Sequence, residues 1–212
     1  MTFASVVLDV DSTLTSIEGI TWLAERRGPD VARAVDAMTE RAMDGAMPLE
    51  AVYAERLALV RPSRADLDAL ADAYVAGLVP GVQSALDALR AANVRLVVVS
   101  GGLRDAVVPF VAALGIAESD VHAVALRFAP DGTYAGFDPS SPLACRRGKP
   151  TIARTLGLPR PVLAVGDGST DAELKECVDA FAAFTGVVRR ESVVAAADYV
   201  VSRFLDLPPL IL

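Results

Sequence analysis

The sequence has very few of the residues that build common metal and redox sites. Its 212 residues include two cysteines and one histidine. Cys145 and Cys177 are too few for a disulfide framework or a thiolate metal site, so we expect buried or free thiols. His122 lies in an apolar run, where a structural role is expected, and its isolation argues against a histidine-rich metal cluster and a Ser-His-Asp hydrolase. Carboxylates are left to carry any acid–base chemistry.

Positive charge and long apolar runs are also scarce. The formal net charge is −7, which gives no basic surface for nucleic acid or an anionic membrane, so we expect neither as a partner. No apolar stretch reaches the roughly 20 residues that span a bilayer, and no signal peptide pattern opens the sequence. These features predict a cytoplasmic protein. A hydrophobic fraction of 53% is typical of a globular chain with a sizeable core.

Short apolar runs that end in small or acidic residues predict the fold. Their length and β-branching are typical of strands buried on both faces of a parallel sheet. The runs cover residues 6–8, 96–99, 121–126 and 162–165, and helical patterns lie between them at 82–92, 106–114, 151–156 and 171–178. This alternation predicts an α/β protein with a doubly wound, Rossmann-like parallel sheet, whose ligands bind beyond the carboxyl ends of the strands.

The segment between the first strand and residue 80 follows a different pattern. Its apolar residues recur at helical spacing in four stretches, residues 18–27, 31–43, 49–59 and 64–76. A strand-to-strand crossover does not need so much chain. We therefore predict a core of residues 1–14 and 80–212 with an inserted helical bundle at 15–79. Glycines near residue 134 also predict a hairpin or turn at the edge of the core.

Two acidic motifs follow predicted strands. Asp9 and Asp11 are separated by one residue, so they project together from the strand end, and such adjacent carboxylates usually bind a cation or share a proton. Asp167 and Asp171 form a second pair between glycines, which let a backbone approach a ligand closely. Oxygen-only ligands in this number favour Mg²⁺, although Asp171 could equally be a carboxylate at a helix N-terminus.

An anion site is predicted at the same edge of the sheet. Ser100, Gly101 and Gly102 lie between a strand and a helix, where hydroxyl and N–H groups can receive an anion. Lys149 is one of only two lysines among 20 basic residues. A lysine kept in a chain that otherwise uses arginine indicates a need for a compact ammonium group.

The order of these motifs resembles the haloacid dehalogenase-like superfamily of phosphatases over almost the entire chain. The matching motifs are Asp-x-Asp-x-Thr at 9–13, Ser-Gly-Gly at 100–102, Lys149, and Gly-Asp-Gly-x-x-Asp at 166–171. Further stretches resemble the phosphoserine phosphatase family within it, at residues 18–20, 38–43, 55–59, 134–138 and 179–181. The resemblance implies Mg²⁺-dependent hydrolysis of O-phospho-L-serine, the last step of serine biosynthesis.

The resemblance also implies roles for single residues. Asp9 would be the nucleophile that becomes phosphorylated, and Asp11 the general acid and base. Mg²⁺ would be held by Asp9, the Asp11 backbone carbonyl and Asp167, with Asp171 acting through water. Ser100, the Gly101 N–H and Lys149 would bind the phosphoryl oxygens.

Substrate specificity would come from the helical insert, acting as a cap. The resemblance implies that Glu18 binds the ammonium group of the substrate and Arg56 its carboxylate, with Met43 and Thr170 nearby. Four positions differ from residues that are frequent in the family: Leu49, Leu103, Ala125 and Thr170. Leu49 and Ala125 could loosen the pocket, so the reaction class is predicted more firmly than strict specificity for L-phosphoserine.

Two other readings fit part of the pattern. A phosphatase of related small phosphates, or a phosphotransferase with another acceptor alcohol, would use the same catalytic residues. A signalling module that is phosphorylated on Asp9 would share the acidic residues, the serine and the lysine, but Asp11 and the cap argue against it. We expect a small phosphorylated amino acid as the ligand and a monomer or a homodimer.

Overall fold

The computed structural model describes residues 2–43 and 49–212. Within these ranges it describes all side chains except those of residues 39–43, 49 and 50. At its centre is a parallel sheet of six strands in the order β3-β2-β1-β6-β7-β8. The strands are β1 (Ser5–Leu8), β2 (Arg95–Leu103), β3 (Val121–Val124), β6 (Val162–Gly166), β7 (Ala180–Phe184) and β8 (Tyr199–Val201). The predicted doubly wound α/β fold is confirmed.

Strand β1 lies in the middle of the sheet and aligns the residues that follow it with those after its neighbours. Val6, Val7 and Leu8 have no exposed surface, as expected for a strand covered on both faces. Leu8 is in register with Val98 of β2 and Val165 of β6. The chain therefore leaves these three strands at the same sheet edge, where the two acidic motifs and Ser100 lie.

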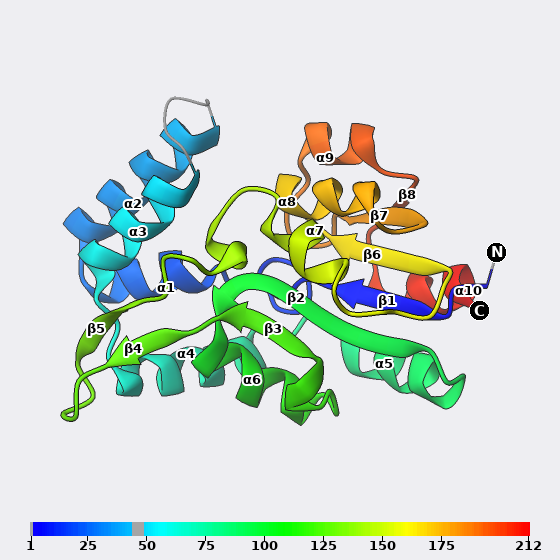
Figure 1. The fold of residues 1–212 in the computed structure, drawn as a ribbon, viewed down its shortest axis with the longest axis horizontal. Coiled ribbons are helices and arrows are strands. Elements are labelled where there is room, and N and C mark those ends of the chain that lie inside the picture. Colours follow the sequence, from blue (N-terminus) through cyan, green and yellow to red (C-terminus); the bar gives the residue numbers. More distant parts are fainter. Residues whose placement is uncertain (1, 44–48) are drawn as a thin grey trace.

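Helices cover both faces of the sheet (Figure 1). One face carries α5 (Val82–Ala91) and α6 (Arg104–Ala113), and the other carries α7 (Gly148–Ala153) and α8 (Ser169–Ala172). The remaining elements of the core are α9 (Glu191–Ala196), α10 (Leu207–Ile211) and the short 3₁₀ helices Glu118–Asp120, Pro142–Ala144, Glu173–Glu176 and Phe204–Asp206. The two chain ends lie close together at one end of the molecule (Figure 1).

The segment between β1 and α5 is helical. It contains α1 (Gly19–Arg26), α2 (Pro29–Met43), α3 (Leu49–Val60) and α4 (Arg64–Ala76). The chain enters and leaves it side by side, because the N–H of Val79 donates to the carbonyl of Leu14 at 3.0 Å. Helices α1, α2 and α3 pack on one another, whereas α4 packs against α6 of the core. The helices are where the sequence predicts them, and the division into two domains stays a prediction.

One predicted strand is wrong in its extent. The run 121–126 divides at Ala125, and β3 ends in the main sheet while β4 (Leu126–Phe128) pairs antiparallel with β5 (Tyr134–Phe137). This pair is the predicted hairpin, and Gly136 takes a φ of 111° within it, which favours glycine. The hairpin packs on the helical segment, with the ring of Phe137 against Tyr53 of α3.

Other boundaries also differ from the sequence prediction. Strands β7 and β8 were not predicted, and the predicted helix 171–178 is replaced by α8 and the 3₁₀ helix Glu173–Glu176. Among the described residues, none of the helices combines the length and apolar character that crossing a membrane requires.

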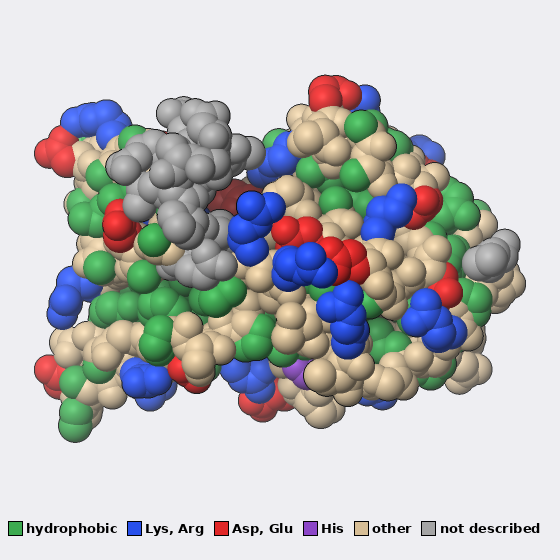
Figure 2. Space-filling model, turned by 45° about the horizontal axis from the view of Figure 1, so that its top comes forward, with side chains coloured by type: hydrophobic (Ala, Val, Ile, Leu, Met, Phe, Trp, Pro, Cys, Tyr) green, Lys and Arg blue, Asp and Glu red, His purple; other side chains and the backbone are tan. Residues whose placement is uncertain are grey.

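Charges of both signs are interleaved on the surface. On the face drawn in Figure 2, basic and acidic side chains lie beside one another. Ion pairs between the described residues include Arg154 with Glu176 at 3.1 Å and Arg160 with Asp179 at 2.9 Å. Among the described residues on this face, positive charge is therefore interrupted by negative charge.

Candidate active site

A cavity of about 280 Å³ opens at the carboxyl edge of the sheet, between the core and the helical segment. This volume is close to the lower end of the range for small-molecule sites, about 300 Å³. All predicted site residues except Met43 line it: Asp9, Asp11, Glu18, Arg56, Ser100, Gly101, Lys149, Asp167, Thr170 and Asp171. The side chain of Met43 lies outside the described residues.

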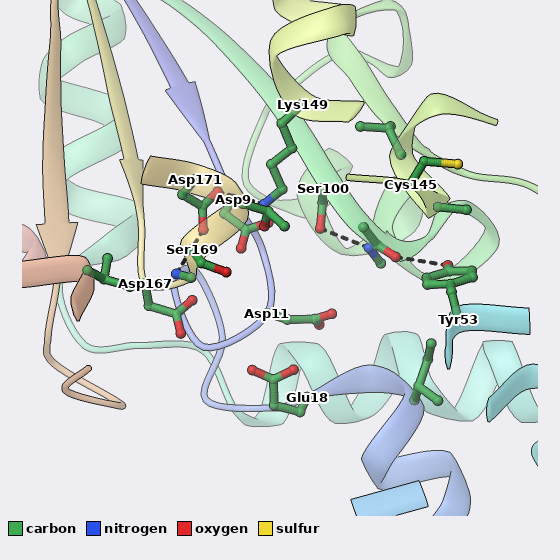
Figure 3. Close-up of a pocket in the computed structure, with 18 of the residues that line it drawn as sticks. Asp9, Asp11, Glu18, Tyr53, Ser100, Cys145, Lys149, Asp167, Ser169 and Asp171 are labelled. Carbon is green, nitrogen blue, oxygen red and sulfur yellow. Dashed lines mark hydrogen bonds and ion pairs between the residues drawn. The ribbon is translucent and has the colours of Figure 1, made fainter. Parts of the chain in front are cut away.

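Three buried carboxylates and one ammonium group form the centre of the site. Ligand oxygens of Asp9, Asp167 and Asp171 all lie within 4.8 Å of one another. The Nζ of Lys149 is 2.8 Å from Asp9 Oδ1 and 2.6 Å from Asp171 Oδ1. Figure 3 shows Lys149 reaching this cluster from the side opposite Glu18. Although burial lowers the pKa of Lys149, the two carboxylates outweigh it and raise the pKa above its usual value.

The glycines of the second acidic motif make room for Asp171. A Cβ on Gly166 would lie 2.1 Å from Asp171 Cγ, so only glycine fits there. The N–H of Gly168 donates to Asp171 Oδ2 at 3.0 Å. Burial and the charge of Asp9 raise the pKa of Asp171 above its usual range. Strand β6 and α8 thus hold a carboxylate where charge is already in excess, which favours a bound cation.

The donor set fits Mg²⁺. Asp9 and Asp167 offer buried carboxylate oxygens and no nitrogen or sulfur ligand belongs to the cluster, which is the chemistry that Mg²⁺ prefers. Thr13 Oγ1 donates to Asp167 Oδ1 at 3.2 Å and orients it. Arg190 forms an ion pair with Asp167 Oδ2, so a cationic group already lies against this carboxylate.

Asp11 lies apart from the three clustered carboxylates. Its Oδ1 accepts a hydrogen bond of 2.6 Å from the hydroxyl of Tyr74. Burial, then the charges of Glu18 and Asp9, raise the pKa of Asp11 well above its usual range. A carboxyl group in this environment holds a proton near neutral pH, as a general acid must.

The predicted anion site differs from a plain turn. Strand β2 runs through Ser100, Gly101 and Gly102 and ends at Leu103, with an irregular register after Val99. The prediction that these residues follow the strand is wrong, since they belong to it. Ser100 Oγ accepts the N–H of Gly102 at 3.0 Å, and Gly101 lines the cavity.

Opposite charges from the helical segment face the centre. Ser12 donates to Glu18 Oε1 at 2.6 Å and holds this carboxylate beside the cavity. The Nε of Arg56 is buried and has no hydrogen-bond partner among the described residues. Burial lowers the pKa of Arg56, and the nearby charges of Glu18 and Asp11 offset only part of this effect. A negatively charged ligand would supply that partner.

Some lining residues are absent from the sequence prediction. Arg190 follows β7, a strand that the sequence pattern does not reveal. The hydroxyl of Tyr53 on α3 donates to the Gly101 carbonyl at 2.9 Å and ties the helical segment to β2. Cys145 also lines the cavity, and neither it nor Cys177 forms a disulfide. No spacing in the sequence marks these residues, since each arrives through tertiary packing.

The four departures from the family pattern take different places. Thr170 lines the cavity, whereas Leu103 is buried in the core and Ala125 is exposed. The side chain of Leu49 lies outside the described residues. Of the four, only Thr170 is seen to border the cavity.

Comparison with known proteins gives the family. A sequence profile of the haloacid dehalogenase-like hydrolases matches residues 6–176. Phosphoserine phosphatase of Homo sapiens is 38% identical over 206 residues, covering 96% of this chain and 91% of its own, and that of Bos taurus is 37% identical with the same coverage. The chain belongs to the phosphoserine phosphatase family of haloacid dehalogenase-like hydrolases. It is thus an enzyme of the phosphoric monoester hydrolase class.

A solved structure extends the family likeness to the fold. A phosphoserine phosphohydrolase-like protein from Francisella tularensis aligns over 100% of both chains with a TM-score of 0.87 and 25% identity. The structural match thus covers the helical segment as well as the sheet and its flanking helices.

Proposed function

We propose that this enzyme hydrolyses O-phospho-L-serine to L-serine and phosphate through a phosphorylated Asp9. One observation carries the proposal: a single cavity holds the Asp9–Lys149 pair, Asp11, and the opposite charges of Glu18 and Arg56. A phosphorylated amino acid carries matching phosphate, ammonium and carboxylate groups. The phosphoserine phosphatases of similar sequence support this substrate.

The reaction would proceed in two balanced steps. The Asp9 carboxylate attacks phosphorus, and the serine oxygen leaves with the proton of Asp11. Asp11, now a carboxylate, takes a proton from a water molecule whose oxygen attacks the phosphoryl group. The bond to Asp9 breaks, phosphate leaves, and Asp9 and Asp11 return to their first states.

The remaining residues would hold the phosphoryl group and the metal. Ser100 and Gly101 at the end of β2 donate to phosphoryl oxygens, and Lys149 neutralises both Asp9 and the transferred charge. Mg²⁺, held by Asp9, Asp167 and the Asp11 backbone carbonyl, would supply further positive charge at the phosphoryl oxygens. Asp171 supports the site through its contact with Lys149 and through water.

Specificity would come from the helical segment 15–79 acting as a cap. Glu18 binds the substrate ammonium, Arg56 binds the carboxylate, and Met43 and Thr170 contribute nearby surface. Closure over the substrate would exclude water other than the nucleophile. Serine biosynthesis is the corresponding pathway, and the cytoplasmic location and the monomeric or homodimeric state stay predictions.

A panel of phosphomonoesters tests this function. Phosphate release is measured for L-phosphoserine, D-phosphoserine and unrelated small phosphates, with Mg²⁺ and with EDTA. We expect kcat/KM to be highest for L-phosphoserine and to vanish with EDTA. Equal values for unrelated esters would instead favour a general small-molecule phosphatase.

The variant Asp9→Asn tests the nucleophile. Loss of the covalent step should reduce kcat by at least about 10³-fold. Asp68→Asn, which changes an exposed carboxylate on α4, is the matched control and should keep full activity. Wild-type turnover in Asp9→Asn would rule out this residue as the phosphoryl acceptor.

A further inference from the structure

Tyr74 connects the helical segment to the carboxyl group of Asp11. It lies in the last turn of α4, it has no exposed surface, and its hydroxyl donates to Asp11 Oδ1 at 2.6 Å. A tyrosine that is fully buried usually needs a partner for its hydroxyl, and here that partner is a group with a proposed chemical role. None of the sequence motifs includes Tyr74.

The surroundings of Tyr74 fix its hydroxyl in place. The ring packs against Phe110 of α6 at a centroid distance of 5.4 Å. A Cβ on Gly19 would lie 2.4 Å from the hydroxyl oxygen, so the first residue of α1 touches it closely. The ring and the hydroxyl are thus held by α1, α4 and α6 together.

The hydrogen bond distinguishes the two oxygens of Asp11. Because Oδ1 accepts from Tyr74, a proton on this carboxyl group belongs on Oδ2. A Cβ on Gly102 would lie 3.4 Å from that Oδ2, so Oδ2 faces the end of β2 where the phosphoryl group would bind.

We propose that Tyr74 is a positioning residue that holds Oδ1 of Asp11 so that Oδ2 presents the proton to the leaving oxygen. The inference rests on the proposed function, in which Asp11 is the general acid. It assigns to α4 a part in the chemistry besides its packing against the core.

Two substrates with different leaving groups test the role. The serine oxygen of phosphoserine needs a proton to leave, whereas the phenolate of p-nitrophenyl phosphate leaves without one. In Tyr74→Phe we expect kcat/KM to fall about 10- to 100-fold for phosphoserine and less than about threefold for p-nitrophenyl phosphate, since general acid catalysis contributes about 10²–10⁴-fold. Because kcat/KM reports the steps up to leaving-group departure, a later step shared by both substrates does not mask the difference.

Equal losses for the two esters, or no loss, would overturn the positioning role. Leu67→Val is the structural control: it shortens a buried side chain of α4 two turns away from Tyr74 and keeps the hydroxyl and the Phe110 contact, so the ratio of the two kcat/KM values should stay at the wild-type value. Gly19→Ala is a second variant, because the added methyl group displaces the hydroxyl, and it should repeat the selective loss. Melting temperatures of all variants report whether each one folds.

The activity of the wild type on the two esters distinguishes a failure of this inference from a failure of the proposed function. A wild type that hydrolyses neither ester would overturn both. A wild type that hydrolyses both, combined with an unchanged ratio in Tyr74→Phe, would overturn the positioning role alone.

Discussion

Arg56 and Asp9 contain the two buried side-chain atoms, Arg56 Nε and Asp9 Oδ1, that lack a hydrogen-bond partner in the described part of the chain. Asp9 Oδ1 still forms an ion pair with Lys149 at 2.8 Å, so its charge is compensated. The guanidinium of Arg56 donates to Thr21 Oγ1 at 3.4 Å. A buried polar atom without a partner destabilises a protein by about 1–3 kcal/mol, and such atoms are retained where a ligand completes them.

Replacing Arg56 by lysine tests whether the guanidinium of this single residue binds the substrate carboxylate. Lysine keeps the positive charge and loses the planar pair of donors that matches a carboxylate. We expect kcat/KM for phosphoserine to fall about 10- to 100-fold, mainly through a higher KM, since hydrogen bonds to charged groups contribute about 1.5–3 kcal/mol. Steady-state kinetics on phosphoserine and on ethyl phosphate, which lacks the carboxylate, provide the comparison.

Arg33→Lys is the matched control for this substitution. Arg33 belongs to the same helical segment and its side chain is 72% exposed. Its replacement should leave both substrates unaffected. If Arg56→Lys lowered kcat/KM for ethyl phosphate as much as for phosphoserine, the guanidinium would not be binding the substrate carboxylate.

Which residues the sequence predicts depends on how each one reaches the cavity. Asp9 and Asp167 directly follow apolar runs, and parallel strands bring such positions to one edge, so they are predictable. Arg190 and Tyr74 depend on how a loop and a helix pack, which no local pattern encodes. For Glu18 and Arg56 the sequence pattern alone indicates ordinary helix charges, and only the family resemblance marked them.

Among the elements, α4 has a start that side chains define well. Ser63 and Asp66 form a capping box, in which each side chain accepts from the backbone N–H of the other. Arg27, just after α1, donates to both oxygens of Asp66. The cap thus joins the start of α4 to the end of α1, and α4 in turn carries Tyr74.

Asp66→Asn should weaken this junction in a pH-dependent way. Loss of the cap contact destabilises a protein by about 1 kcal/mol. The hydrogen bond from Arg27 holds the pKa of Asp66 well below its usual range. A lowered pKa stabilises the fold above the unfolded value of about 3.9, and this stabilisation disappears as the pH falls through the folded value.

Urea unfolding at pH 7 and at pH 3 measures the effect. We expect the difference in unfolding free energy between wild type and Asp66→Asn to be about 1 kcal/mol at pH 7 and smaller at pH 3. Asp68→Asn, two residues along the same helix and exposed, should match the wild type at both values. An equal loss for Asp66→Asn at both pH values would contradict a role for its charge.

The sequence pattern missed some elements because their residues give no distinct local signal. Strand β7, Ala180–Phe184, is mostly alanine and phenylalanine and lacks the β-branched residues that indicate a strand. The run 121–126 is continuously apolar, so nothing in its periodicity shows that Ala125 ends one strand and precedes another. Long helices with clear spacing, such as α4, were predictable because their pattern repeats over several turns.

At the scale of the whole molecule, the acidic cluster draws on distant parts of the chain. Asp9 directly follows β1 and Asp167 directly follows β6, and Thr13, from the loop after β1, donates to Asp167 Oδ1 at 3.2 Å. Because these carboxylates repel one another when ionised, a bound cation should stabilise the complete fold more than any isolated part.

Metal binding should therefore appear in thermal unfolding without any turnover. At 100 times the dissociation constant a ligand stabilises the folded state by about 2.7 kcal/mol. For a chain of this length we expect Mg²⁺ to raise the melting temperature by roughly 5–10 °C over EDTA-treated protein. Differential scanning calorimetry at several Mg²⁺ concentrations measures the shift.

Asp167→Asn should abolish most of this shift, whereas Asp68→Asn should preserve it. Ca²⁺ serves as a second probe, because its larger size and higher coordination number suit the site less well. A melting temperature of the wild type that did not respond to Mg²⁺ would argue against a metal at the three carboxylates.

The central place of β1 also determines when its two sides are completed during synthesis. Ser5 of β1 pairs with Val162 of β6, so the N-terminal strand must wait for most of the chain before that side is covered. At roughly 5–20 residues per second this takes on the order of 10 s. Throughout this interval a nascent chain presents an apolar strand edge that can pair with other chains.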